Sequence, residues 1–196
     1  MLAQPISAGV KAGLPVTSLI DTVSSFSTTV SSQTHSYIVG PTVEVRLPAG
    51  FGVEFDALYR RFSYNANSPS VSTYLNIRTT GSDWEFPLLI KKRFASGPIR
   101  PFLDAGVSFS KLSGLEETVV SVVNTVSGNN NPAALKHDFA TGFVIGAGLD
   151  LHLLLHITPE VRYTRWGREH FDATIGPGAS LNSTQNQAEF LLGITF

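Results

Sequence analysis

Strict alternation of apolar and polar residues recurs along this chain, and it constrains the fold more than any other feature. In the final stretch "AEFLLGITF", one face carries Phe190, Leu192, Ile194 and Phe196, while Glu189 lies on the other. A period of two is that of a β-strand, because successive side chains point to opposite faces. No segment has convincing helical periodicity, so an all-β fold is expected. Eight segments show the alternation: 6–14, 37–47, 51–60, 84–91, 102–110, 139–151, 159–166 and 188–196.

The connections between these segments alternate in length. Three are short, near 48–50, 95–97 and 154–156. Four are long and polar, near 16–35, 64–80, 111–136 and 167–185. Their Ser, Thr, Asn, Gly and Pro content favours turns and coil. Alternating short and long connections are typical of an up-and-down meander, with tight turns at one end and extended loops at the other. We predict a single domain covering residues 1–196.

The content of the polar face decides which side of the sheet is inside. A soluble barrel would carry many long polar side chains there, whereas a membrane barrel turns that face into its lumen. Here the face carries Gly, Ser, Thr and a limited set of mixed charges, and charged residues are only 15% of the chain. Eight acidic and five basic residues are interleaved across neighbouring strands. This is the arrangement expected of buried charges, because such charges must be paired. The predicted lumen charge network comprises Lys11, Glu44, Arg46, Glu54, Asp56, Arg60, Glu85, Lys91, Asp104, Asp150, Glu160, Arg162 and Glu189.

Strand length and number fit a membrane barrel. Strands of about 9–11 residues span a bilayer when they are tilted. A spanning sheet must close on itself, because an open edge would leave backbone groups unpaired in hydrocarbon. Eight is an even number, as bacterial single-chain barrels have. We therefore predict a closed, eight-stranded, antiparallel, up-and-down transmembrane β-barrel in which the first strand pairs with the last.

Composition excludes several other classes. The net charge of −1 gives no general attraction to nucleic acid. Cysteine is absent, so neither a disulfide framework nor a thiolate metal site is expected. No run of 18 apolar residues occurs, which excludes a transmembrane helix. The N-terminal stretch "MLAQPISAGV" has no basic region followed by an apolar one. We expect the mature form of an exported protein, with an added Met1.

The chain resembles the small eight-stranded outer-membrane β-barrels, the group that includes OmpA transmembrane domains, OmpX and OmpW. The resemblance covers almost the whole chain and rests on "ISAGVKAGLPVT", "WEFPLLIKKRF", "IRPFLDAGVSFS", "GFVIGAGLDLHL" followed by "PEVRYTRW", and "AEFLLGITF". It implies a bacterial outer-membrane location, with short turns in the periplasm and long loops outside. It also implies recognition by the barrel-assembly machinery, for which the signal looks like Phe190, Leu192, Ile194 and Phe196.

Candidate chemistry in the sequence is weak. The run "GAGLDL" (146–151) lacks the helix and third spaced glycine of a nucleotide loop, and a lumen-facing glycine row is the better interpretation. Glu54 and Asp56 have bases nearby and are better explained as part of a salt-bridge network than as acid–base catalysts. We expect no cofactor and no catalytic residue.

The five histidines are the remaining candidates. Barrels that deacylate lipid A resemble a His-x-Ser arrangement, in which Ser follows His by two positions. No histidine of this chain is followed by Ser in this way. His156-x-Thr158 is the nearest match, and it lies at the expected periplasmic end. His152 and His156 share a parity and flank a tight turn, but the sequence offers no evident third ligand. We therefore expect surface or turn histidines and no metal site. The full set is His35, His137, His152, His156 and His170.

These observations favour a monomeric, non-catalytic barrel with a structural or surface-interaction role, embedded in the lipid bilayer. Its long loops are a platform on which an extracellular ligand would bind. An eight-stranded ring is just wide enough for its own side chains, which favours a blocked lumen. The alternatives are a narrow channel or hydrophobic-solute transporter, a lipid-modifying outer-membrane enzyme, and a soluble lipocalin-like binding barrel.

Overall fold

The described part of the chain folds almost entirely into strands. A computed structural model describes residues 6–17, 20–23, 29–34, 37–70, 73–94, 97–121, 125–128, 137–152, 155–168, 172–174 and 180–196. Nine long strands are β1 (Ile6–Pro15), β4 (Ile38–Arg46), β5 (Phe51–Asp56), β6 (Leu58–Ser70), β7 (Thr73–Arg93), β8 (Ile99–Ser121), β10 (Phe139–His152), β11 (His156–Trp166) and β14 (Asn186–Thr195). The other five strands are β2 (Ile20–Val23), β3 (Thr29–Thr34), β9 (Thr125–Gly128), β12 (Asp172–Thr174) and β13 (Ser180–Ser183). Within these described ranges, no helix is long and apolar enough to cross a membrane.

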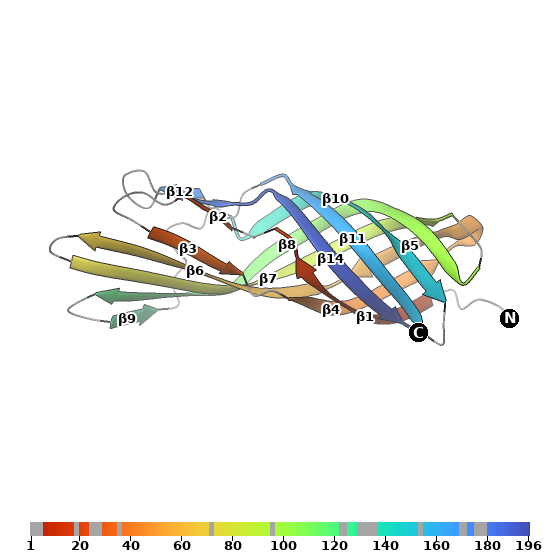
Figure 1. The fold of residues 1–196 in the computed structure, drawn as a ribbon, viewed down its shortest axis with the longest axis horizontal. Helices are drawn as coiled ribbons and strands as arrows, with labels where there is room; N and C mark the ends of the chain where they lie inside the picture. Colours follow the sequence, from red (N-terminus) through yellow and green to blue (C-terminus); the bar gives the residue numbers. More distant parts are fainter. Residues whose placement is uncertain are drawn as a thin grey trace.

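The long strands form a closed antiparallel ring in the order β1, β4, β5/β6, β7, β8, β10, β11, β14 (Figure 1). β5 and β6 count as one interrupted strand, so the ring has eight strands. β14 pairs with β1, with Val10 opposite Ile194. At the edge of this pair, Ala8 and Phe196 exchange two backbone hydrogen bonds, with N···O distances of 3.2 and 3.0 Å. The predicted closed, eight-stranded meander is confirmed.

The interruption between β5 and β6 is a single residue, Ala57, and the prolines beside it account for the break. Its N–H donates to the Pro41 carbonyl oxygen at 3.0 Å. On the other side, Pro87 lies opposite Asp56 in the register of β5 and β6 against β7 and has no N–H to offer the ladder. The register is the same before and after the break, so β5 and β6 do not slip relative to β7.

Burial shows which face is inside. Lys11 and Arg162 are each 1% exposed, whereas Ile6 is 58% and Val161 is 56% exposed. The large apolar side chains therefore point outward and the charged ones point into the ring. This is the arrangement of a membrane barrel, since lipid replaces water around the apolar belt. It is the opposite of a soluble lipocalin-like barrel, and that alternative is excluded.

The 3-10 turn at Pro48–Gly50, the start of β1 and the end of β14 lie at one end of the barrel, the right-hand end in Figure 1; we call this the short-turn end. The connection from β4 to β5 is a 3-10 turn at Pro48–Gly50. Ala49 and Gly50 have positive φ angles of 61° and 77° there, which lets the chain reverse in few residues. The other short turns lie partly outside the described residues.

At the opposite end, strands continue well past the ring. β7 has 21 residues and β8 has 23, roughly twice the length that spans a bilayer. β6 and β7 stay paired out to Ser70 and Thr73, and β3 and β9 add to the two edges (Figure 1). β2, β12 and β13 form a separate three-stranded sheet. Parts of the segments that composition assigned to turns and coil are therefore in strands.

Candidate functional site

The interior of the ring gathers the charged residues that the alternation placed on the lumen face. Twelve of the thirteen are buried, and Arg46 is half-buried. They come from every strand of the ring, because each strand turns alternate residues inward. They divide into three groups along the barrel axis, and Asp104 stands apart from them.

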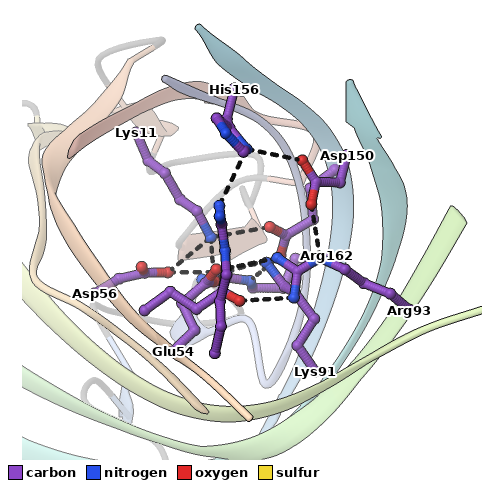
Figure 2. Close-up of polar contacts among 11 residues, drawn as sticks. Lys11, Glu54, Asp56, Lys91, Arg93, Asp150, His156 and Arg162 are labelled. Atoms are coloured by element: carbon purple, nitrogen blue, oxygen red, sulfur yellow. Dashed lines mark hydrogen bonds and ion pairs between the residues drawn. The ribbon is translucent and has the colours of Figure 1, made fainter. Parts of the chain in front are cut away.

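The middle group joins strands that face each other across the ring. The Lys11 Nζ of β1 lies 3.1 Å from Asp56 Oδ2 and 2.9 Å from Glu160 Oε2, and it also contacts Glu54. The Arg162 Nη2 of β11 lies 2.9 Å from Asp56 Oδ2 and 2.7 Å from Glu160 Oε1. Figure 2 shows these side chains converging on the axis. Lys91 completes the group on Glu54, which gives three cations and three carboxylates.

The second group lies closer to the end opposite the short-turn end, which we call the long-connection end. It centres on Arg60 of β6. Its guanidinium is 2.8 Å from Asp83 Oδ2, contacts Glu85, and reaches Glu189 Oε1 of β14 at 3.3 Å. The Gln187 side-chain oxygen accepts from the same guanidinium at 2.9 Å. One cation thus holds three carboxylates, from two walls of the ring.

The third group lies at the short-turn end and centres on Arg93 of β7. Arg93 is 2.7 Å from Glu44 Oε1 of β4 and 2.6 Å from Asp150 Oδ2 of β10, so it also joins opposite walls. Arg46 does not join this pair. Its Nη2 instead lies 3.0 Å from His156 Nδ1.

Asp104 is the predicted network residue that the structure leaves without a bond. It is 4% exposed, and neither carboxylate oxygen has a hydrogen-bond partner among the described residues. It faces Gly146, where a Cβ atom would overlap Asp104 Oδ1. The glycine of "GAGLDL" therefore makes room for a lumen side chain, in agreement with the glycine-row interpretation.

Two residues central to these groups, Asp83 and Arg93, were missed in the sequence. Asp83 also accepts from the Ser110 hydroxyl at 2.6 Å. Both residues have the parity of the lumen face, since Asp83 is two residues before Glu85 and Arg93 is two after Lys91. They were missed because the predicted segment began at Trp84 and ended at Lys91. Extending the alternation by one period in each direction would have found them.

Apolar side chains fill much of the remaining interior. Leu58, Phe102 and Trp166 are 1%, 2% and 4% exposed. At Gly148, a Cβ atom would lie 2.6 Å from the Phe102 ring, so the ring occupies the space that a side chain would need. Together with the charged groups, these side chains occupy much of the lumen.

The outer wall has one large apolar depression, with a volume of about 680 Å³. It lies over small residues, including Ala105 and Ala147, and is lined by larger neighbours such as Leu103 and Tyr163. The backbone ladders beneath it are continuous from β7 through β8 and β10 to β11. The depression is therefore a dent in the lipid-facing surface, and the described wall has no lateral opening there.

The histidines and the closing strand complete the placement of the predicted residues. His35 and His170 lie outside the described residues. His152 and His156 face each other across the β10–β11 hairpin, and the structure places Asp150 beside them as a third group. Phe190, Leu192 and Ile194 on β14, and Phe196 directly after it, are all exposed on the outer face. Their role as an assembly signal stays a prediction.

Comparison with known proteins points to one family. The family model described as "Outer membrane protein beta-barrel domain" matches residues 2–167. Among solved structures, OprG of Pseudomonas aeruginosa is similar, with 13% identity, a TM-score of 0.53, and coverage of 97% of this chain and 94% of that one. The N-terminal β-barrel domain of Pseudomonas aeruginosa OprF (13%, 0.40, 98% and 98%) and Neisserial surface protein A (11%, 0.42, 98% and 98%) also match. No curated protein matches significantly.

Proposed function

Because the chain belongs to the family of outer membrane protein β-barrel domains, a bacterial outer-membrane family, we propose that it is a non-conducting, non-catalytic barrel that presents a projecting sheet at the cell surface. The proposal includes a monomer inserted by the barrel-assembly machinery. The short-turn end faces the periplasm, and the long-connection end faces outward. One observation carries the proposal: side chains from opposite walls bond to each other across the lumen.

The trans-lumen contacts occur at three levels. Arg162 of β11 meets Asp56 of β5, and these strands are four positions apart in a ring of eight. Closer to the long-connection end, Arg60 joins β6 to β14. Closer to the short-turn end, Arg93 of β7 bonds to both β4 and β10. Permeation would require breaking several buried ion pairs, and each unpaired buried charge costs several kcal/mol. These contacts support a closed lumen and argue against the alternative hypothesis of a narrow channel.

The projecting sheet supports a surface-interaction role. About ten residues of β7 lie beyond the length needed to span the bilayer, which corresponds to roughly 30 Å of strand at about 3.3 Å per residue. β6, β7 and β8 remain hydrogen-bonded through this projection. A sheet holds its surface in place better than mobile loops do, so a ligand meets it with a smaller ordering cost.

Conductance in planar bilayers tests the closed lumen. The purified wild-type protein should give no discrete current steps, whereas an Arg60→Gly/Arg93→Gly/Arg162→Gly variant, which removes the bridging cation at each of the three levels, should give them. Heat-modifiable migration on SDS gels checks that both are folded. Discrete wild-type steps at the frequency of the triple variant would contradict the proposal.

The surface role is tested by shortening the projection without disturbing the ring. Asn65 and Arg78 face each other in the β6–β7 ladder, so residues 66–77 can be replaced by a two-residue Asn-Gly turn. Cells displaying the full and shortened proteins are compared for binding to arrays of immobilised polysaccharides and matrix proteins. The proposal expects binding that is lost on shortening while surface expression is kept. Equal binding by both would count against it.

A further inference from the structure

Three potential metal ligands meet at the short-turn end of the barrel. His152 is the last residue of β10 and His156 the first of β11, and they pair across the hairpin. Asp150 is two residues before His152, on the same strand face. One ligand atom from each residue lies within 4.8 Å of those from the other two. The ring centroids of the two imidazoles are 3.7 Å apart, at an interplanar angle of 67°.

The spacing of the ligand atoms suits a small divalent ion. Asp150 Oδ1 lies 3.4 Å from His152 Nδ1 and 3.7 Å from His156 Nδ1. Zinc bonds of about 2.0–2.2 Å in tetrahedral geometry place ligand atoms about 3.3–3.6 Å apart. Only small side-chain movements would therefore bring the three atoms into coordination.

Two of these atoms have no other use in the part of the chain that the structure describes. Asp150 is 1% exposed, and its Oδ1 has no hydrogen-bond partner, nor does His152 Nδ1. Leaving a buried carboxylate oxygen without a hydrogen-bond partner costs free energy. Because Asp150 Oδ1 lies beside both imidazoles, a metal ion bound there would satisfy it. The other oxygen, Oδ2, accepts from Arg93 Nε at 2.6 Å, which fixes the carboxylate as an outer-shell partner would (Figure 2).

The site is accessible from solvent. The His152 and His156 side chains are 25% and 22% exposed, so an ion can enter without opening the barrel. Two imidazoles and one carboxylate leave a fourth position for water. Imidazole nitrogen favours Zn²⁺, Cu²⁺ and Ni²⁺ over Mg²⁺, which prefers oxygen ligands.

One cation already competes for the site. The Arg46 Nη2 donates to His156 Nδ1 at 3.0 Å. A metal ion on that nitrogen must displace the guanidinium. Arg46 is half-buried at the mouth of the barrel, so it has room to turn out towards solvent.

We propose that Asp150, His152 and His156 bind a divalent transition-metal ion at the short-turn mouth, with Zn²⁺ as the test ion. In the metal-free protein, the Arg46 guanidinium is hydrogen-bonded to His156 Nδ1 and so lowers the affinity of the site for the metal ion. The inference is independent of the proposed function, because these residues meet whether or not the lumen conducts.

The test is calorimetric titration of the full-length, tag-free, chelator-treated protein in detergent with ZnCl₂. We expect one ion per chain, and no heat of binding with MgCl₂. His152→Ala and His156→Ala should each weaken Zn²⁺ binding about tenfold or more. His137→Ala, which changes a histidine at the other end of the barrel, should leave it unchanged. Co²⁺ should give the visible absorption bands of a tetrahedral site.

Arg46→Ala gives a second readout in the opposite direction, since removing the competitor should tighten Zn²⁺ binding several-fold. Heat-modifiable gel migration must be the same for every variant compared. No Zn²⁺ uptake by the wild-type protein would overturn the proposal. Full affinity in a His152→Ala/His156→Ala variant would overturn it too, and unchanged affinity in Arg46→Ala would contradict the assignment of His156 Nδ1 as a ligand.

Discussion

Arg162 Nη2 lies 2.9 Å from Asp56 Oδ2, although the two residues belong to strands on opposite sides of the ring. Both side chains are buried, at 1% and 0% exposure. Each charge also has a second partner in the middle group, Glu160 for Arg162 and Lys11 for Asp56. The pair therefore connects two walls that share no backbone hydrogen bond.

Glu160→Ala should destabilise the barrel strongly. Glu160 accepts from both Lys11 and Arg162, so its removal leaves two buried cations underpaired. Breaking a buried ion pair in this way costs about 3–5 kcal/mol. Reversible urea unfolding from lipid vesicles gives the free energy of unfolding. Glu116→Ala, at an exposed carboxylate beyond the network, is the matched control and should change it little. An unaltered midpoint for Glu160→Ala would refute this account of the network.

Gly106→Ala should also destabilise, for a steric reason. Gly106 faces the lumen on β8, and an added Cβ atom would overlap the backbone carbonyl oxygen of Leu88 on β7. Backbone cannot move aside as a flexible side chain can, so overpacking of about 1–3 kcal/mol or more is expected. Ala105→Leu changes the adjacent residue, which points into lipid, and should be nearly neutral. The same unfolding measurement decides; equal stability of the two variants would show that the strands have slack here.

Val161→Arg should reveal the lipid-facing surface. Val161 is 56% exposed near the middle of β11. An arginine facing lipid at the bilayer midplane costs about 2–4 kcal/mol. Val161→Leu keeps the surface apolar and should leave the free energy of unfolding unchanged within error. If Val161→Arg unfolds at the wild-type urea concentration, this face does not lie in the hydrocarbon region.

Phe196→Gln separates assembly from stability. The backbone of Phe196 is hydrogen-bonded to Ala8, and this substitution keeps those bonds. If the terminal aromatic side chain is the signal read by the assembly machinery, folded barrel in the outer membrane should fall several-fold. Refolding into vesicles, which needs no machinery, should be close to normal. If the amount of folded Phe196→Gln barrel in the outer membrane equals that of the wild type, the side chain is not the assembly signal. If membrane assembly and refolding into vesicles fall equally, the side chain acts in folding.

The sequence predicted the strands and their faces well, because period-two alternation follows directly from strand geometry. It also placed Lys11, Asp56 and Arg162 inside. It could not predict that these three would touch, because contacts across a ring depend on strand tilt and stagger, which no local pattern records. The third metal ligand was missed for a related reason: Asp150 was assigned to the lumen network, and only the folded structure brings its Oδ1 to 3.4 and 3.7 Å from the Nδ1 atoms of His152 and His156.

The projecting strands were missed because their composition favours coil. Ser, Thr and Asn mark turns when no partner strand is considered. In β6 and β7, backbone pairing runs from Leu58–Glu85 to Ser70–Thr73. This pairing depends on hairpin register and not on an apolar face, so hydropathy carries little information about it.

The central claim is that ion pairs hold opposite walls of a closed lumen together, and a double-mutant cycle on Asp56 and Arg162 tests it most directly. The free energies of unfolding from vesicles are measured for wild type, Asp56→Ala, Arg162→Ala and the double variant. Residues in one buried network should couple, with an interaction energy of about 1–3 kcal/mol, so the double variant loses less than the sum of the single ones. Strict additivity, with a coupling energy of zero within error, would contradict the claim.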